Sequence, residues 1–189
     1  MNDQKMTDVV LDALPAILER DVQVALLGRG DPVLEDRVRQ VGRQYPGRVA
    51  TCIGYEEPLA HRFQAGADIL LHPARFEPCG LTQLYAMRYG TLPIVRHVGG
   101  LADTIVAADD DSIRRRTATG FAFEGATAAD MIASLDRSLD LYRQPLAWRR
   151  VQRCAMQRDF GWERFRPRIS RALPAARAPR RPGGPGQRA

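Results

Sequence analysis

The residues best suited to carry chemistry lie in one loop, from Arg75 to Thr82. Gly80 lets the backbone approach a ligand closely, and a helix is predicted to begin just beyond it. The free N–H groups and positive dipole end of that helix would face an anion such as a phosphate, and the Thr82 hydroxyl can add a donor. Glu77 has the wrong sign for phosphate but can accept hydrogen bonds from sugar hydroxyls. A helix cap or a surface carboxylate is the equally weighted alternative for Glu77.

A second glycine pair, Gly99-Gly100, follows a short apolar run and can form a backbone nest for oxyanions. Two nests that face one crevice suit a diphosphate better than a monophosphate. Lys5 and Arg29 could supply the countercharge for a leaving diphosphate, although a lone lysine near a terminus is usually just solvated. Tyr55, which follows Gly54, could stack on a base or could be a half-buried core residue.

Other candidate motifs are weaker. Gly28-Arg29-Gly30 has the context of a phosphate-binding loop, but Val33 stands where a third glycine would complete a dinucleotide fingerprint. A tight turn between a strand and a helix is therefore the favoured interpretation. The three histidines, His61, His72 and His97, and the three cysteines, Cys52, Cys79 and Cys154, have no metal-ligand or disulfide spacing. The sequence thus predicts no metal, no cofactor and reduced thiols.

These loops must be positioned by elements that end where the loops begin. Short apolar runs, often β-branched, predict strands buried on both faces of a parallel sheet at Val22–Leu27, Val49–Ile53, Ile69–Leu71, Leu92–Val95 and Gly120–Phe123. Helices are predicted between them, with apolar stripes at Val9, Val10, Ala13, Ile17 and Leu18; at Val33, Leu34, Val38 and Val41; at Leu81, Leu84 and Tyr85; and at Ile132, Leu135, Leu139 and Tyr142. This alternation predicts an α/β fold, a Rossmann-like parallel sheet with helices on both faces. Ligands bind such sheets at the carboxyl ends of the strands, where the glycine loops lie.

Composition narrows the class of protein further. The chain has 189 residues, which suits one well-buried domain, and a net charge of +6. The stretch 174–189 carries four of those six charges and is rich in Pro, Ala, Gly and Arg, so we expect a disordered tail there. The rest shows no basic stripe interleaved with aromatic residues, which argues against a nucleic-acid partner. No apolar run approaches the roughly 18 residues of a membrane span, and no signal peptide is recognisable. A cytoplasmic protein without a membrane partner is expected.

Taken in order, these residues closely resemble the signature of bacterial glycogen synthases and plant starch synthases. The resemblance rests on the run from Gly66 to Thr91, with Arg75-Phe76-Glu77-Pro78-Cys79-Gly80-Leu81-Thr82-Gln83 at its centre. It continues in Gly99-Gly100-Leu101-Ala102-Asp103-Thr104, Thr119-Gly120-Phe121 and Asp159-Phe160-Gly161-Trp162, and upstream in Gln4-Lys5, Leu27-Gly28-Arg29-Gly30-Asp31-Pro32 and Ile53-Gly54-Tyr55. The similarity covers Gln4 to Leu173, and a match of this length and order is highly specific.

The resemblance implies the second domain of a GT-B glycosyltransferase, in which two Rossmann-like domains close over a sugar donor. It implies retaining transfer of glucose from ADP-glucose to an α-1,4-glucan (glycogen) without a metal. The roles implied for this chain are glucose binding by Glu77 with the backbone of Cys79 and Gly80, distal-phosphate binding by Leu81 and Thr82, diphosphate neutralisation by Lys5, and adenine contact by Gly54 and Tyr55. Gly99 and Gly100 belong to the same expected ADP-glucose site.

The chain departs from the family pattern in several places. Met6 stands where glycine is usual, Ala74 replaces a serine, His97-Val98 replaces an arginine–threonine pair, and Tyr85 occupies the second place of a paired-glutamate pattern. The upstream acceptor-side domain, with its Lys-X-Gly-Gly motif, and an arginine usual before Lys5 have no counterpart. We therefore expect residues 1–173 to be the nucleotide-sugar domain of a fragment that binds ADP or ADP-glucose weakly and does not elongate glucan alone.

Two other functions compete with this one. An inactive or merely ADP-glucose-binding fragment is the first alternative. A GT-B enzyme that uses a UDP-sugar, with trehalose or sucrose chemistry, is the second, and the Glu-Pro-Cys-Gly-Leu-Thr-Gln run argues against it.

Overall fold

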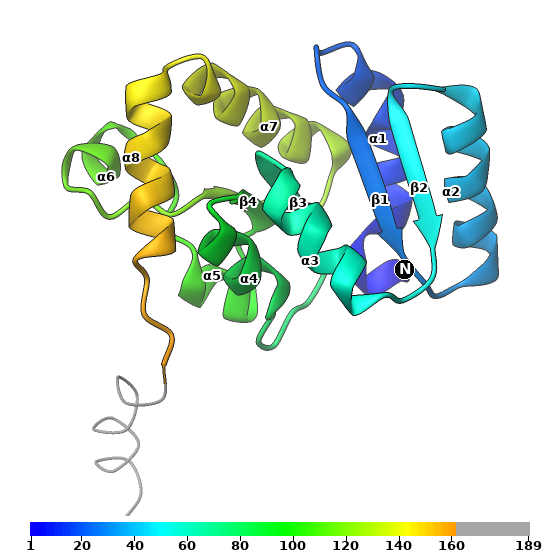
Figure 1. Cartoon of the computed structure of the whole chain (residues 1–189), viewed down its shortest axis with the longest axis horizontal. Coiled ribbons are helices and arrows are strands. Elements are labelled where there is room, and N and C mark those ends of the chain that lie inside the picture. The colour runs from blue at the N-terminus through cyan, green and yellow to red at the C-terminus, as the bar shows by residue number, and fades with distance from the viewer. Residues whose placement is uncertain (162–189) are drawn as a thin grey trace, which may run out of the picture. The chain divides into compact units, whose positions relative to one another are not determined.

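The computed structural model describes residues 1–161, in which five strands alternate with helices (Figure 1). The strands are β1 (Val24–Gly28), β2 (Val49–Ile53), β3 (Ile69–His72), β4 (Leu92–Arg96) and β5 (Phe121–Phe123). The helices are the short 3-10 turn η1 (Asp3–Lys5), α1 (Thr7–Leu18), α2 (Pro32–Gln44), α3 (Glu57–Gly66), α4 (Thr82–Tyr89), α5 (Gly99–Thr104), α6 (Asp110–Arg114), α7 (Ala128–Tyr142) and α8 (Pro145–Met156). Every predicted strand is present, within two residues of its expected bounds.

All strand pairs are parallel, and helices lie on both sides of the strands, so the predicted α/β class is confirmed. The pairing nevertheless divides the strands into two groups, β1–β2 and β3–β4–β5, whereas one continuous sheet was expected. Within residues 1–158, which form one compact unit, α1 packs against α7 and so joins the two groups through helices.

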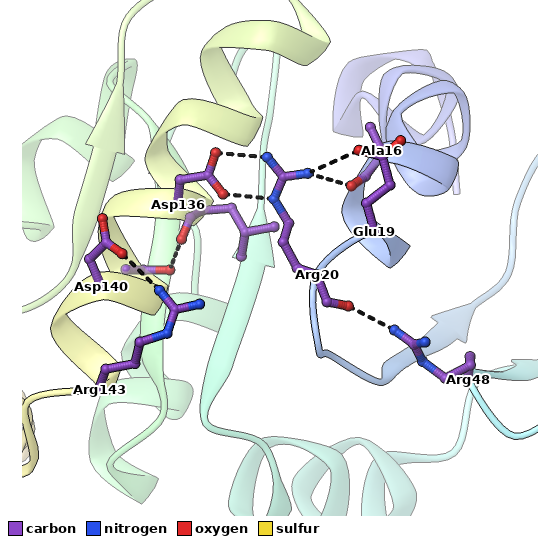
Figure 2. Close-up of polar contacts among 9 residues, drawn as sticks. Ala16, Glu19, Arg20, Arg48, Asp136, Asp140 and Arg143 are labelled. Atoms are coloured by element: carbon purple, nitrogen blue, oxygen red, sulfur yellow. Dashed lines mark hydrogen bonds and ion pairs between the residues drawn. The ribbon is translucent and has the colours of Figure 1, made fainter.

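An ion-pair fork reinforces that junction. Arg20, just beyond α1, donates to both carboxylate oxygens of Asp136 on α7 from Nε and Nη2, each at 2.7 Å (Figure 2). Arg48 completes the polar cluster, because its guanidinium donates to the carbonyls of Leu18, Arg20 and Val22, between the end of α1 and the start of β1. The Arg20–Asp136 fork thus crosses between the β1–β2 group and the β3–β4–β5 group.

Local sequence explains several element ends. The Asp31 carboxylate caps α2 by accepting from the N–H groups of Val33 and Leu34, and Pro32 occupies the first helical position. Thr127 and Asp130 form a reciprocal capping box on α7. Gly90 ends α4 in the left-handed region, at φ 86°.

The predicted apolar stripes were only partly right. Val33, Leu81, Tyr85 and Tyr142 are exposed, whereas the buried faces use Leu11, Ala13, Leu14 and Ile17 on α1, Gln83, Ala86 and Met87 on α4, and Met131, Ser134, Leu135, Ser138 and Leu141 on α7. The reason is that several buried positions are polar residues whose side chains donate hydrogen bonds to backbone carbonyls. The Ser138 hydroxyl, for example, donates to the Leu135 carbonyl at 2.6 Å, and a hydropathy pattern cannot see such a bond.

The predicted domain boundary at residue 173 and the predicted disordered tail, 174–189, lie outside the described residues. Among residues 1–161 the longest helix, α7, has 15 residues, and none has the length and apolar character needed to cross a membrane.

Candidate functional site

The candidate site is organised around a contact between Lys5, at the end of η1, and Glu77, in the loop between β3 and α4. The Lys5 ammonium donates to the Glu77 carboxylate, although 72 residues separate the two. Lys5 keeps 40% of its side chain exposed, while Glu77 is only 7% exposed as a residue. The structure therefore places the predicted diphosphate cation directly beside the predicted sugar-binding carboxylate.

Glu77 is held in its ionised form. Burial raises its pKa, but the hydrogen bond and charge of Lys5 lower it more, and the net direction is downward. His72, at the end of β3, interacts electrostatically with this pair, and its Nε2 atom is buried and without a hydrogen-bond partner among the described residues. Burial, followed by the positive charge of Lys5, lowers the pKa of His72 to about 4, so its ring is neutral near pH 7. Neutral His72 adds no charge to the site.

The loop after Glu77 delivers the N-terminus of α4 to the same place. Gly80 has φ 68°, a conformation that strongly favours glycine. The N-cap residue of α4, Leu81, makes no side-chain capping bond, so the first N–H groups of the helix are not capped by a side chain. Gln83 is fully buried, and its amide donates to the Gly80 carbonyl at 2.8 Å. The buried Gln83 thus supports the start of α4 from the protein interior, while Thr82, at the first position of the helix, is half-buried.

Gly99 and Gly100 are pressed against the Glu77 loop. The Gly100 N–H donates to the Glu77 carbonyl at 2.8 Å. A Cβ atom at Gly99 would lie 2.3 Å from the Glu77 carbonyl oxygen, and one at Gly100 would lie 2.4 Å from that of Cys79. Only glycine allows these backbones to approach so closely. Glu77, Gly80, Thr82 and Gly99 thus lie in the loops and helix starts that follow β3 and β4, at the carboxyl ends of these strands where the sequence places them.

Gly54 and Tyr55 stand at the carboxyl end of β2, in the other strand group. Tyr55 is 80% exposed, which rules out the half-buried core residue considered from the sequence. No hydrogen bond within residues 1–161 links either of them to the Glu77 loop. The structure leaves the Tyr55 ring free to contact a ligand, and its adenine contact stays a prediction. The Gly28-Arg29-Gly30 segment leads from β1 into α2, and its Gly30 N–H donates to Glu35 at 2.8 Å.

Sequence reasoning missed a set of residues that support this site. Besides Gln83, they are Arg75, whose guanidinium bonds Asp8 on α1, and Arg96, which donates to the Arg75 carbonyl at 3.0 Å. Arg75 and Gln83 flank the Glu77 motif and could have been suspected from that position. Asp8 carried no such signal, because its partner lies 67 residues away.

A parallel α/β unit with an ionised carboxylate, a lysine and a helix N-terminus at the carboxyl ends of its strands suits a nucleotide-sugar site. Comparison with known proteins agrees, since residues 1–140 match the family described as glycosyl transferases group 1. The chain belongs to that family.

Its similarity to particular members is high. The chain is 49% identical over 163 residues to the glycogen synthase of Edwardsiella ictaluri (strain 93-146), an alignment that covers 86% of this chain and 34% of the relative. It is 51% identical over 161 residues to the glycogen synthase of Cellvibrio japonicus (strain Ueda107), with 85% of this chain and 33% of the relative covered. The resemblance to glycogen synthases is confirmed, and the chain spans about a third of the length of these relatives.

Solved structures give the same answer. The catalytic domain of starch synthase IV from Arabidopsis thaliana, bound to ADP and acarbose, superimposes with a TM-score of 0.81 at 32% identity, covering 90% of this chain and 36% of that one. A sucrose-phosphate synthase from Thermosynechococcus elongatus matches at 22% identity with a TM-score of 0.67, covering 90% of this chain and 42% of that one. The second likeness concerns the fold alone.

Proposed function

We propose that this chain is the ADP-glucose-binding part of a glycogen synthase, which transfers glucose with retention to the end of an α-1,4-glucan. The relatives about half identical to it are glycogen synthases, and the starch synthase of similar fold was solved with ADP. The proposed location is the cytoplasm, in keeping with the three unpaired cysteines, Cys52, Cys79 and Cys154.

The observation that carries this proposal is the meeting of Lys5, Glu77 and the start of α4 in one place. In the proposed complex, the Glu77 carboxylate accepts hydrogen bonds from glucose hydroxyls. The Lys5 ammonium and the N–H groups at residues 81–82 neutralise the diphosphate, which gains charge as the glycosidic bond breaks. Cys79 and Gly80 contribute backbone beside the sugar, and Gly99-Gly100 closes the other side.

Lys5 must exchange partners for this to happen. It pairs with Glu77, and a diphosphate would compete for the same ammonium. Because Lys5 is 40% exposed, its ammonium is within reach of a dianionic ligand, whose two charges compete with the single charge of Glu77. Glu77 then becomes free to receive the sugar hydroxyls.

Calorimetric titration of the chain with ADP and with ADP-glucose tests these roles. We expect Lys5→Ala to weaken both ligands by a similar factor, since both carry the diphosphate. Glu77→Gln, which keeps the side-chain shape, should weaken ADP-glucose strongly but leave ADP unchanged or slightly tighter, because Lys5 is then released. Glu56→Gln, in an exposed position before α3, serves as the matched control.

Equal losses for ADP and ADP-glucose in Glu77→Gln would contradict the sugar-binding role. The proposal assigns charge stabilisation to Lys5 and α4, so chelation with EDTA is expected to leave ADP affinity unchanged.

Incorporation of labelled glucose into glycogen separates an enzyme from a binding module. We expect measurable incorporation from a protein that joins this chain to an acceptor-side domain, and none from this chain by itself, because acceptor positioning supplies about 7–11 kcal/mol of the barrier reduction.

A further inference from the structure

The segment that carries Lys5 is bonded along the loop that carries Glu77. The Arg75 N–H donates to the Gln4 carbonyl at 2.8 Å, and the Gln4 amide returns a bond to the Phe76 carbonyl at 2.9 Å. Each of these bonds joins residues about 70 positions apart, and each lies within two residues of Lys5 or Glu77. These two hydrogen bonds, between Gln4 and the Arg75–Phe76 backbone, therefore set the distance between the Lys5 and Glu77 side chains.

The Arg75 side chain grips the Lys5 segment on both sides. Its guanidinium forms a fork with the Asp8 carboxylate at 3.0 and 2.8 Å, and Nη1 also lies 3.0 Å from the Asp3 carboxylate and donates to the Asp3 carbonyl. Asp3 precedes Lys5, while Asp8 follows it in the first turn of α1. One guanidinium thus holds both ends of the turn that presents Lys5.

The charge state of Asp8 favours a persistent contact with Arg75. The Arg75 hydrogen bond, against an opposing contribution from burial, lowers the pKa of Asp8, so the carboxylate stays ionised. Asp8 also lies at the positive end of the α1 dipole, which favours its charge. A planar fork fixes direction as well as distance, which a lysine in place of Arg75 could not do.

We propose that Arg75, through Asp8, is a positioning residue that sets the Lys5 ammonium against Glu77 for donor binding. The inference rests on the proposed function of that site. Arg75 itself contacts no reacting group. Because it precedes Glu77 by two residues and also bonds the turn that carries Lys5, loss of its contacts would move both this turn and the Glu77 loop.

The chain offers a matched control for a purely structural role. Arg20 and Asp136 form an equivalent fork at 2.7 and 2.7 Å, at the opposite end of α1 from Asp8 and Lys5. It also offers a selective probe, because Lys5 is the only lysine in the 189-residue sequence. Acylation by an amine-specific reagent, followed by peptide mass spectrometry, reports on the Lys5 amine separately from the N-terminal amine.

The experiment compares Arg75→Gln, Arg75→Lys and Asp8→Asn with Arg20→Gln and Asp136→Asn. Three quantities are measured: thermal midpoint, affinity for ADP and ADP-glucose, and the rate of Lys5 acylation. We expect Arg75→Gln and Asp8→Asn to weaken ADP-glucose by about tenfold and to speed Lys5 acylation several-fold, with Arg75→Lys in between. The Arg20 and Asp136 variants should lower the thermal midpoint by a similar amount without changing either the affinity or the acylation rate.

Wild-type affinity and acylation in Arg75→Gln, together with a lower thermal midpoint, would make Arg75 structural and overturn the proposal. If Arg75→Gln does not fold, Asp8→Asn decides by the same criteria. If the wild-type chain binds neither nucleotide, the proposed function fails, and acylation alone then decides the positioning role: faster acylation supports it and an unchanged rate overturns it.

Discussion

Replacing Met6 by glycine tests how the turn after Lys5 is stabilised. Met6 joins η1 to α1 with φ 51° and ψ 32°, the left-handed region that glycine occupies without steric cost. Its side chain is nevertheless fully buried. Relief of the backbone conformation would gain about 1–2 kcal/mol. Loss of a buried methionine side chain costs about 2–5 kcal/mol. The difference between these ranges is a net loss of about 0–4 kcal/mol, and we expect Met6→Gly to lower the free energy of unfolding by about 2 kcal/mol, the middle of that range.

Thermal unfolding provides the assay, and Met6→Ala is the matched control. The expected loss for glycine corresponds to a fall in the thermal midpoint of roughly 4–8 °C in a chain of this size. Alanine removes nearly the same side-chain volume but keeps the left-handed penalty, so Met6→Ala should be about 1 kcal/mol less stable than Met6→Gly. That order reverses the usual preference for alanine over glycine. An alanine variant as stable as the glycine variant would refute the conformational argument, and a glycine variant more stable than wild type would refute the burial argument.

Three further outcomes are expected. Gly100→Ala should lose about 1–3 kcal/mol of stability and weaken ADP-glucose binding in calorimetry, because its Cβ would lie 2.4 Å from a loop carbonyl oxygen. Gly66→Ala, with open space around its Cβ, should change neither. In urea unfolding, a double-mutant cycle of Arg20→Gln and Asp136→Asn should give a coupling of about 0.5–1 kcal/mol, since the Asp136 side chain is 46% exposed. His72 is neutral when folded, with a pKa of about 4, and takes up a proton near pH 6.5 when unfolded. The titration of His72 therefore leaves the free energy of unfolding unchanged above pH 6.5. As the pH falls from 6.5 towards 4, protonation of the unfolded state lowers that free energy by at most about 3 kcal/mol. A His72→Val variant should not show this fall.

The strands and the loops after them could be predicted from the sequence because their signals are local. A strand buried on both faces is a short run of apolar residues, and a backbone that must turn sharply beside a ligand needs glycine. The structure bears this out at Gly80 and Gly99, both with positive φ. The parallel class followed from the spacing of strands and helices, and so did the end of the strands at which Glu77 would lie.

The buried faces of the helices were harder to predict. A helix such as α7 buries Ser134 and Ser138 against backbone carbonyls, so its inward face is not its most apolar one. Likewise α4 buries Gln83 and exposes Tyr85. These choices depend on which partner atoms the neighbouring elements offer, and hydropathy does not contain that information.

What the sequence by itself determined about this protein is the kind of elements, their order and the composition of the loop from Arg75 to Thr82. Each of these depends on residues a few positions apart, whose preferences are set by sterics and local hydrogen bonds. Only the tertiary structure decided that Lys5 meets Glu77 and that Arg75 grips Asp8. Charges of opposite sign are numerous along the chain, and exposed charges alone attract too weakly to choose their partners. The pairs that form here are those that the packing of α1 beside the β3–α4 loop brings within a few ångströms.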